Sequence, residues 1–166
     1  MGRLIVPARL SNDAPTVISG KYATGQTFIK GAALAFTAGE LVEATSPITG
    51  ATLVGIALEA CASRPGYDAA NSPTVVTGRK QEISYVRADD EQIFSGQLVN
   101  NSTTVVAPTQ ADIGVSYGLK PQTVNSKNEW YVDKSQTTTN ACVTIVDIDT
   151  DLNIVFFKFL SARLAT

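Results

Sequence analysis

The sequence predicts an all-β protein: a single-domain β-barrel or β-sandwich with an extended N-terminal arm. Its 166 residues are enough for one well-buried core and too few for two full domains. Charged residues make up only 17% of the chain, and glycine, threonine, serine, valine and alanine supply much of the rest, a composition that suits strands joined by many turns. Short apolar runs alternate with turn-forming residues, and no apolar repeat of helical period is sustained.

Residues 1–24 are expected to form the extended arm. The apolar run Leu4, Ile5 and Val6 is followed by Pro7, and more prolines and turn formers follow before residue 24. Proline fixes its own φ and restricts the residue before it, so this density of prolines disfavours a helix. Such an arm can lie on its own domain or add as a strand to a neighbouring molecule, and the sequence leaves both open.

Residues 25–166 are expected to form a β-rich body, organised around the stretch from 25 to 60. A helix over residues 31–44 is the competing interpretation, and the glycines in and before it count against that helix. Residues 37–40, Thr-Ala-Gly-Glu, predict a reversal between two strands, because glycine readily adopts a positive φ. The expected strands of this stretch are 28–29, 32–36, 41–42 and 53–58, with a second turn at 46–50.

The remainder of the body shows the same alternation of strands and turns. The strongest loop signal is at 63–73, which carries Pro-Gly and Ser-Pro near its two ends. Further strands are expected at 74–77, 82–87, 130–132, 142–148 and 153–160.

The last of these strands is apolar on both faces. Val155, Phe157 and Phe159 share one face, and Ile154 and Phe156 share the other. This pattern predicts a central strand, or a strand that another chain partly covers.

A weak internal repeat is visible in the body. Residues 39–43 resemble 96–100, and 54–57 resemble 113–116. If the repeat is real, two similar strand-turn-strand units around 25–60 and 90–120 pack on each other.

The chain lacks a set of residues for catalysis, and we expect it not to be an enzyme. It contains no histidine, which removes the usual Ser/His and Cys/His arrangements and the commonest metal ligand. Cys61 and Cys142 have no partner at the spacing of a zinc site, so we expect buried reduced thiols, and the sequence leaves a disulfide open. We therefore expect no metal and no cofactor.

One acidic segment invites comparison with a calcium-binding loop. Asp147, Asp149 and Asp151 alternate as at the start of an EF-hand. Position six of that loop is Leu152 where glycine is required, and position twelve is Lys158 where glutamate is required. The segment is therefore expected to be an acidic hairpin turn.

Charge and hydropathy argue against two classes of binding partner, nucleic acids and membranes. The formal net charge is -2 and no basic run occurs, which argues against nucleic-acid binding. The longest apolar runs fall far short of the roughly 18 residues of a membrane helix, and no signal-peptide pattern is seen at the N-terminus. We expect no membrane partner and synthesis in the cytoplasm.

The turn-and-strand motifs resemble a known family. Three of them carry the likeness: Gly25-Gln-Thr-Phe-Ile-Lys-Gly-Ala, Thr37-Ala-Gly-Glu-Leu-Val-Glu-Ala and Val54-Gly-Ile-Ala-Leu-Glu-Ala. Together with Tyr117-Gly-Leu and Trp130-Tyr-Val-Asp, they are similar to the capsid decoration, or cement, proteins of tailed bacteriophages. The resemblance implies a homotrimer that binds the major capsid protein on the exterior of the virion, after synthesis in the bacterial host.

Under this resemblance, two regions are candidates for capsid contact. The first is the arm, with Leu4, Ile5, Val6 and Leu10, and the second is the loop 64–73, with Arg64 and Tyr67. The subunit contact of a trimer is expected on the last strand, which includes Phe157 and Phe159.

Two alternatives share the composition. The first is another phage structural component, such as a tail or head-fibre base protein. The second is a carbohydrate-binding β-domain that stacks a sugar on Trp130, Tyr131 and Tyr117.

Overall fold

The computed structural model of the protein describes residues 4–8, 15–23, 25–61 and 82–165. This part of the chain is nearly all β, with three single-turn 3-10 helices, so the predicted fold class is confirmed. None of its helices is long and apolar enough to cross a membrane. The strands are β1 (Val6–Pro7), β2 (Val17–Lys21), β3 (Ala33–Thr37), β4 (Glu40–Glu43), β5 (Leu53–Ala57), β6 (Glu82–Arg87), β7 (Phe94–Val99), β8 (Ser116–Val124), β9 (Lys127–Asp133), β10 (Val143–Asp149) and β11 (Ile154–Phe159).

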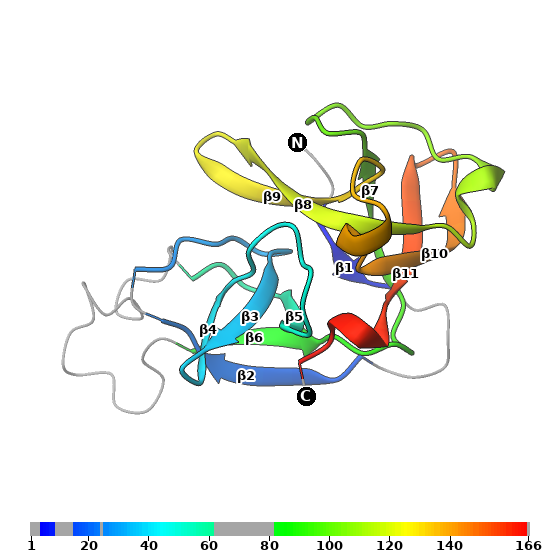
Figure 1. Cartoon of the computed structure of the whole chain (residues 1–166). Coiled ribbons are helices and arrows are strands. Elements are labelled where there is room, and N and C mark those ends of the chain that lie inside the picture. Colours follow the sequence, from blue (N-terminus) through cyan, green and yellow to red (C-terminus); the bar gives the residue numbers. More distant parts are fainter. Residues whose placement is uncertain (1–3, 9–14, 24, 62–81, 166) are drawn as a thin grey trace.

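The strands form two packed sheets (Figure 1). The six-stranded sheet has the order β1-β7-β11-β10-β8-β9, and β9 also pairs in parallel with the far end of β7. The additional pairing curls this sheet back on itself. β11 lies between β7 and β10, which confirms the prediction of a central strand.

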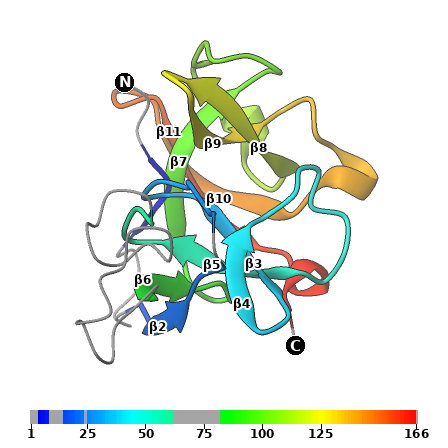
Figure 2. The same ribbon diagram turned by 90° about the vertical axis from the view of Figure 1, so that its left-hand side faces the viewer.

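The five-stranded sheet has the order β2-β6-β5-β3-β4, and it also curls (Figure 2). Its two edge strands meet at one point, where Tyr22 and Leu41 form a parallel bridge. There the N–H of Ala23 donates a hydrogen bond of 2.9 Å to the carbonyl oxygen of Leu41. Among the described residues no further pairing joins β2 to β4, so the sheet is closed at one end only.

The two sheets share one continuous apolar core. On the six-stranded sheet, the rings of Phe94, Phe157 and Phe159 are all buried and contact one another, with centroids 5.0–6.0 Å apart. A backbone contact links the sheets near the C-terminus, where the N–H of Ala165 donates to the carbonyl of Leu53 at 2.8 Å. Burial of each of these rings stabilises the fold by roughly 1.5–3 kcal/mol relative to an exposed ring.

The described parts of residues 1–24 pair with strands of the same chain. β1 pairs with β7, with Val6 opposite Ser95. β2 is a full member of the five-stranded sheet and pairs with β6 along its whole length. Of the two arrangements that the sequence left open for this segment, the described residues adopt the first, since they lie on their own chain.

Two hairpins show how local sequence sets the turns. β3 and β4 are joined at Ala38 and Gly39, whose φ angles are 50° and 81°. β8 and β9 are joined at Asn125 and Ser126, with φ angles of 50° and 61°. Two successive residues with positive φ form the turn whose twist matches that of the flanking strands.

Some expected elements differ from the structure. Residues 28–29 are not a strand, although Phe28 is buried. The loop 63–73 and the strand 74–77 lie outside the described residues. In the suggested repeat, Gly39 lies in a hairpin turn whereas Gly96 lies inside β7, so the two similar stretches have different local structures.

Candidate functional site

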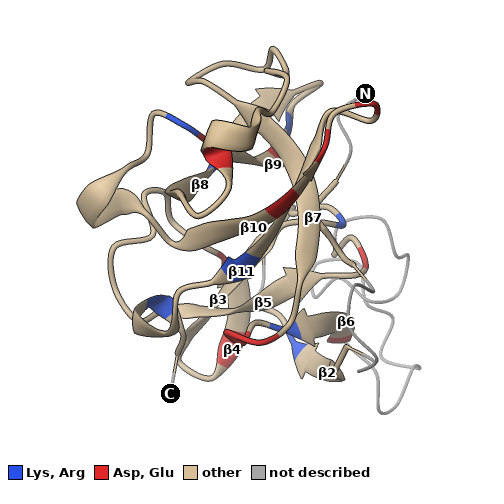
Figure 3. Ribbon diagram, turned by 90° about the vertical axis from the view of Figure 1, so that its right-hand side faces the viewer, with Lys and Arg blue, Asp and Glu red and all other residues tan. Residues whose placement is uncertain are grey.

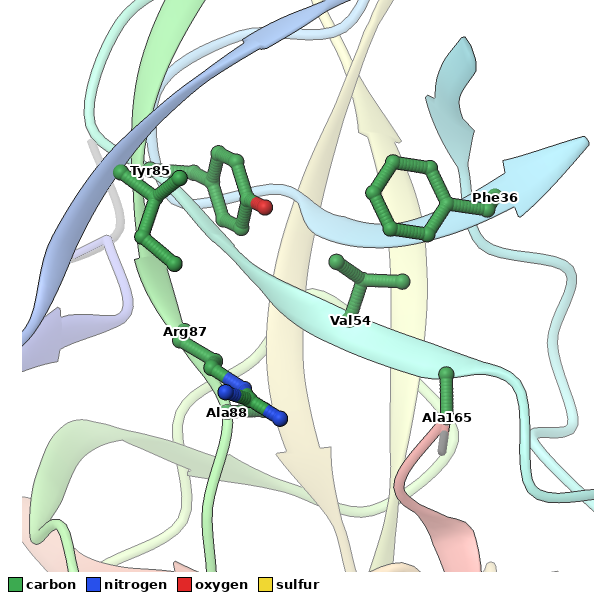
Figure 4. Close-up of a pocket in the computed structure, with 7 residues that line it drawn as sticks. Phe36, Val54, Tyr85, Arg87, Ala88 and Ala165 are labelled. Atoms are coloured by element: carbon green, nitrogen blue, oxygen red, sulfur yellow. The ribbon is translucent and has the colours of Figure 1, made fainter. Parts of the chain in front are cut away.

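A shallow apolar hollow opens at the unclosed end of the five-stranded sheet, and we call it the Phe36 hollow. Its volume is about 250 Å³, below the roughly 300–1,000 Å³ of pockets for small organic ligands. Phe36, Val54 and Tyr85 point toward one another across it (Figure 4). The hollow is therefore large enough for a single amino-acid side chain but smaller than the usual pocket for an organic ligand. It is lined by Ile18, Phe36, Val54, Tyr85, Arg87, Ala88 and Ala165.

Two glycines set the depth of Tyr85, which forms one wall of the hollow. A Cβ atom on Gly55 would lie 2.6 Å from Cδ2 of Tyr85 and 2.3 Å from the carbonyl oxygen of Val86. A Cβ atom on Gly20 would lie 3.0 Å from Cε1 of Tyr85. The ring thus rests on bare backbone from β2 and β5, and a larger residue at either position would displace it.

A β-bulge brings Val54 into the hollow. Leu34 of β3 is opposite Gly55, and the next residue, Ala35, is opposite Leu53. Val54 is therefore the extra residue on β5, with no partner on β3. A bulge of this kind re-aims a side chain, and here it directs Val54 toward the hollow rather than continuing the alternation of the strand.

Phe36 forms the rim and is unusually exposed for its size. It lies opposite Leu41 in the β3–β4 hairpin, so the two side chains share a face of the sheet. Leu41 is fully buried, whereas Phe36 keeps 49% of its surface exposed. The two residues differ in exposure because the Tyr22–Leu41 bridge closes the sheet over Leu41, whereas no further strand pairing among the described residues covers Phe36.

Arg87 is the charged residue of the hollow. Its side chain is exposed at the end of β6, no carboxylate lines the hollow, and Arg87 has no ion pair among the described residues. Burial raises the pKa of the neighbouring Tyr85 hydroxyl, and the positive charge of Arg87 partly offsets that effect. The site thus combines apolar walls, a neutral phenol and a guanidinium that forms no ion pair with the described residues.

A second depression, of about 420 Å³, lies beside the first, between the β3–β4 hairpin and residues 45–52. Phe36 lines both. The carboxylate in this depression belongs to Glu43, and its two oxygens accept hydrogen bonds from Trp130 and Asn128. Glu43 is therefore engaged in a structural contact.

A polar cluster around Asp112 is also structural. The carboxylate accepts bonds of 2.7 Å from the Tyr117 hydroxyl and the Lys134 ammonium, and of 2.8–2.9 Å from the N–H and hydroxyl of Thr109. Burial favours a higher pKa for Asp112, but these bonds outweigh it and hold the pKa well below the usual range. Burial and the hydrogen bond to Asp112 raise the pKa of Tyr117 to about 12, so neither group is poised for proton transfer near pH 7.

The two cysteines are free thiols in the core, as predicted. Burial raises the pKa of Cys61 to about 11 and that of Cys142 to about 12. In the part of the chain that the structure describes, no group of three or more histidine, cysteine or acidic residues could hold a metal ion.

The structure describes only some of the residues expected to contact a capsid from the arm and the loop. Leu4 and Val6 are half-buried, and Ile5 is buried against the chain's own strands, so Ile5 presents no surface to a partner. Leu10, Arg64 and Tyr67 lie outside the described residues.

Phe157 and Phe159, which were expected at a subunit contact, are buried within the chain itself. Both side chains face the interior and pack on Phe94. The alternation along β11 was predicted correctly, but the face with these two rings is covered by the chain's own core. Only Phe156 and Lys158 on the opposite face are partly exposed.

The aromatic platform expected for a sugar does not exist at the surface. Trp130, Tyr131 and Tyr117 are all buried. A carbohydrate ring needs an exposed aromatic face, so these three residues do not support the carbohydrate-binding alternative.

Sequence reasoning missed the residues of the Phe36 hollow. A signal existed for Arg87, which follows Ile83 and Tyr85 at every second position and so shares their face of a strand. Phe36 carried a weaker signal, as the last apolar residue before the hairpin turn. No protein-family model, no curated protein and no solved structure matches this chain.

Proposed function

We propose that the protein is a structural component of a tailed-phage virion, which binds the outer surface of the capsid and stabilises contacts between major capsid subunits. The observation that carries the proposal is the Phe36 hollow, an exposed aromatic rim over an apolar floor, with an arginine that has no ion pair among the described residues. Such a surface fits a protein partner, because it buries apolar area and offers one charge for orientation. The resemblance of the turn-and-strand motifs to capsid decoration proteins supplies the kind of partner.

The physical character of the described body agrees with this role. The buried ionisable side chains are held in bonds that fasten the fold, such as Asp112 with Lys134 and Tyr117. In the view of Figure 3, the described Lys and Arg residues and the described Asp and Glu residues are interspersed along the ribbon rather than separated by sign. A protein that binds only the assembled shell stabilises that shell by mass action, and many bound copies multiply the effect.

Co-sedimentation with shells tests the proposal. Purified protein is mixed with expanded capsids of the phage that encodes it, with shells of an unrelated phage as the control. We expect binding that saturates at a fixed number of copies per capsomer and raises the temperature at which the shells disrupt. Protein that stays in the supernatant with both shells would contradict the proposal, and binding to purified tails instead would favour a tail component.

Light scattering after size-exclusion chromatography tests the self-association that the resemblance implies. We expect the mass of a homotrimer, three times the 17.5 kDa of the chain. Because Phe157 and Phe159 are buried in each chain, the subunit contact would use other residues. A monomer at every concentration would remove the trimer from the proposal.

A further inference from the structure

Part of β2 presents an open strand edge. In the antiparallel ladder of β2 and β6, the N–H of Arg87 donates to the carbonyl oxygen of Thr16 at 3.1 Å. Backbone groups along an antiparallel strand point alternately toward and away from the partner. The N–H and C=O groups of Val17 and Ser19 therefore point away from β6.

Nothing among the described residues pairs with that edge. The other contact of β2 with a strand is the bridge between Tyr22 and Leu41, at the far end of β2. Val17 is also 55% exposed, although it is a β-branched residue suited to a cross-strand contact. An exposed edge with unpaired backbone groups is a template for another strand.

The open edge borders the Phe36 hollow. Ile18, which lies between the two outward-facing residues of β2, lines the hollow with its side chain. A strand added beside β2 would lie about 4.7–4.9 Å away, with side chains alternating between its two faces. A side chain next to Ile18 would then enter the hollow against Phe36. The side chain two residues away on the added strand would lie next to Thr16. Thr16 lies opposite Arg87, so this side chain would be on the same face of the sheet as Arg87 and close to it.

The charge of Arg87 indicates what kind of strand could bind beside β2. In the part of the chain that the structure describes, Arg87 has no ion pair and no carboxylate lines the hollow, so the complementary partner carries an acidic side chain. A second copy of β2 does not meet this requirement, because residues 15–21 contain Lys21 and no acid. The edge therefore fits a different strand rather than a two-fold pairing of β2 with itself.

We propose that the open edge of β2 and the Phe36 hollow together bind an extended strand of a partner protein, with an aliphatic side chain and, two residues away, a carboxylate. The inference rests on the proposed function, in which that partner is the major capsid protein. Backbone hydrogen bonds to Val17 and Ser19 supply affinity, and the two side chains supply specificity and register.

Two variants and a control test the inference on shells. Ser19→Pro removes an outward N–H and leaves the ladder with β6 intact, since proline is tolerated where the N–H faces solvent on an edge strand. Phe36→Asp places a charge in the apolar hollow. Each is expected to weaken co-sedimentation with shells by at least about tenfold. Leu152→Asp, at an exposed turn between β10 and β11, is the matched control and is expected to bind like the wild type. Unchanged thermal unfolding confirms that each variant is folded.

A peptide separates this inference from the proposed function. Acetyl-Thr-Leu-Thr-Asp-Thr-amide and its reversed sequence present the required pair of side chains in either strand direction. We expect one of them to shift the NMR amide signals of Val17 and Ser19, and the same peptide with asparagine for aspartate to bind at least about tenfold more weakly. If shells bind, their response to Ser19→Pro and Phe36→Asp decides, and binding unchanged by both variants overturns the strand site. If shells do not bind, the proposed function fails and the peptides decide, because no shift from either peptide overturns the strand site as well.

Discussion

The indole N–H of Trp130 in β9 donates a hydrogen bond of 2.7 Å to the carboxylate of Glu43 in β4. The side-chain amide of Asn128 donates to the other carboxylate oxygen at 3.2 Å. Trp130 is buried, and the two strands belong to different sheets. One carboxylate therefore fastens the six-stranded sheet to the five-stranded sheet.

Replacement of Glu43 by alanine is expected to lower the free energy of unfolding by about 1–3 kcal/mol, because the buried indole N–H loses its acceptor. Trp130 is the only tryptophan, so urea unfolding followed by its fluorescence reports the change directly. Glu40→Ala is the control, since the Lys21–Glu40 ion pair is largely exposed and is worth about 0–1 kcal/mol. Equal losses in the two variants would contradict the role given to Glu43.

Asp112 is expected to make the fold sensitive to acid. Its pKa is lower in the folded chain than in the unfolded chain, so its bonds stabilise the fold fully above the unfolded value of about 4 and are lost as the pH falls below it. Asp112→Asn is expected to cost about 3 kcal/mol at pH 7 and to lose less further stability between pH 4 and pH 2 than the wild type. Urea unfolding at several pH values measures both effects. The exposed Asp151→Asn is expected to behave like the wild type, and a parallel acid profile for Asp112→Asn would be inconsistent with the assigned role.

Gly55→Ala is expected to destabilise the fold by about 1–3 kcal/mol or more, because its Cβ would meet both the carbonyl oxygen of Val86 and the ring of Tyr85. Gly50→Ala is the matched control, with its nearest neighbouring atom at 3.6 Å and a change expected within about 0.5 kcal/mol. Thermal unfolding compares the two. Similar melting temperatures would show that the backbone beneath Tyr85 yields easily.

The thiols of Cys61 and Cys142 are expected to resist labelling in the native protein. Burial raises their pKa values to about 11 and about 12, so very little thiolate exists at pH 8, and neither side chain is accessible. Reaction with a chromogenic disulfide reagent is expected to be slow in buffer and complete within minutes in denaturant. Rapid modification of either cysteine in buffer would show that the core opens locally around it.

Much of the fold follows from local sequence patterns. The expected strand at residues 82–87 coincides with β6, and the predicted reversal at 37–40 contains the two positive φ angles of a hairpin turn. The alternation of Phe157 and Phe159 against Phe156 along β11 was also predicted. These features depend on neighbours in the sequence, which is why a pattern is enough to find them.

Other elements depend on distant partners and were missed. β8 runs through Gly118 and Pro121, which indicate a break when considered locally. Pro121 is tolerated because β10 pairs with β8 only at Ser116 and Tyr117, so one edge of β8 is free at the proline. β2 was likewise assigned to an arm, because its strand character comes from its pairing with β6.

The Phe36 hollow was beyond the sequence patterns for the same reason. The wall formed by Tyr85 needs Gly20 and Gly55, from β2 and β5, on either side of the ring. The position of Val54 in the hollow needs a bulge in β5, and that bulge exists only relative to the register of β3. Neither relationship produces a pattern in consecutive residues, so the site can be identified only once the strands are placed side by side in the sheet.

Arg163 holds one corner of the molecule together. Its guanidinium donates to the carbonyl oxygens of Thr49, Thr139 and Ala141, which come from segments on both sheets. Because one planar guanidinium reaches all three carbonyl groups, it joins these segments without a strand pairing between them. A single-point cation such as lysine cannot bridge three acceptors in this way, so the geometry of this corner depends on one side chain.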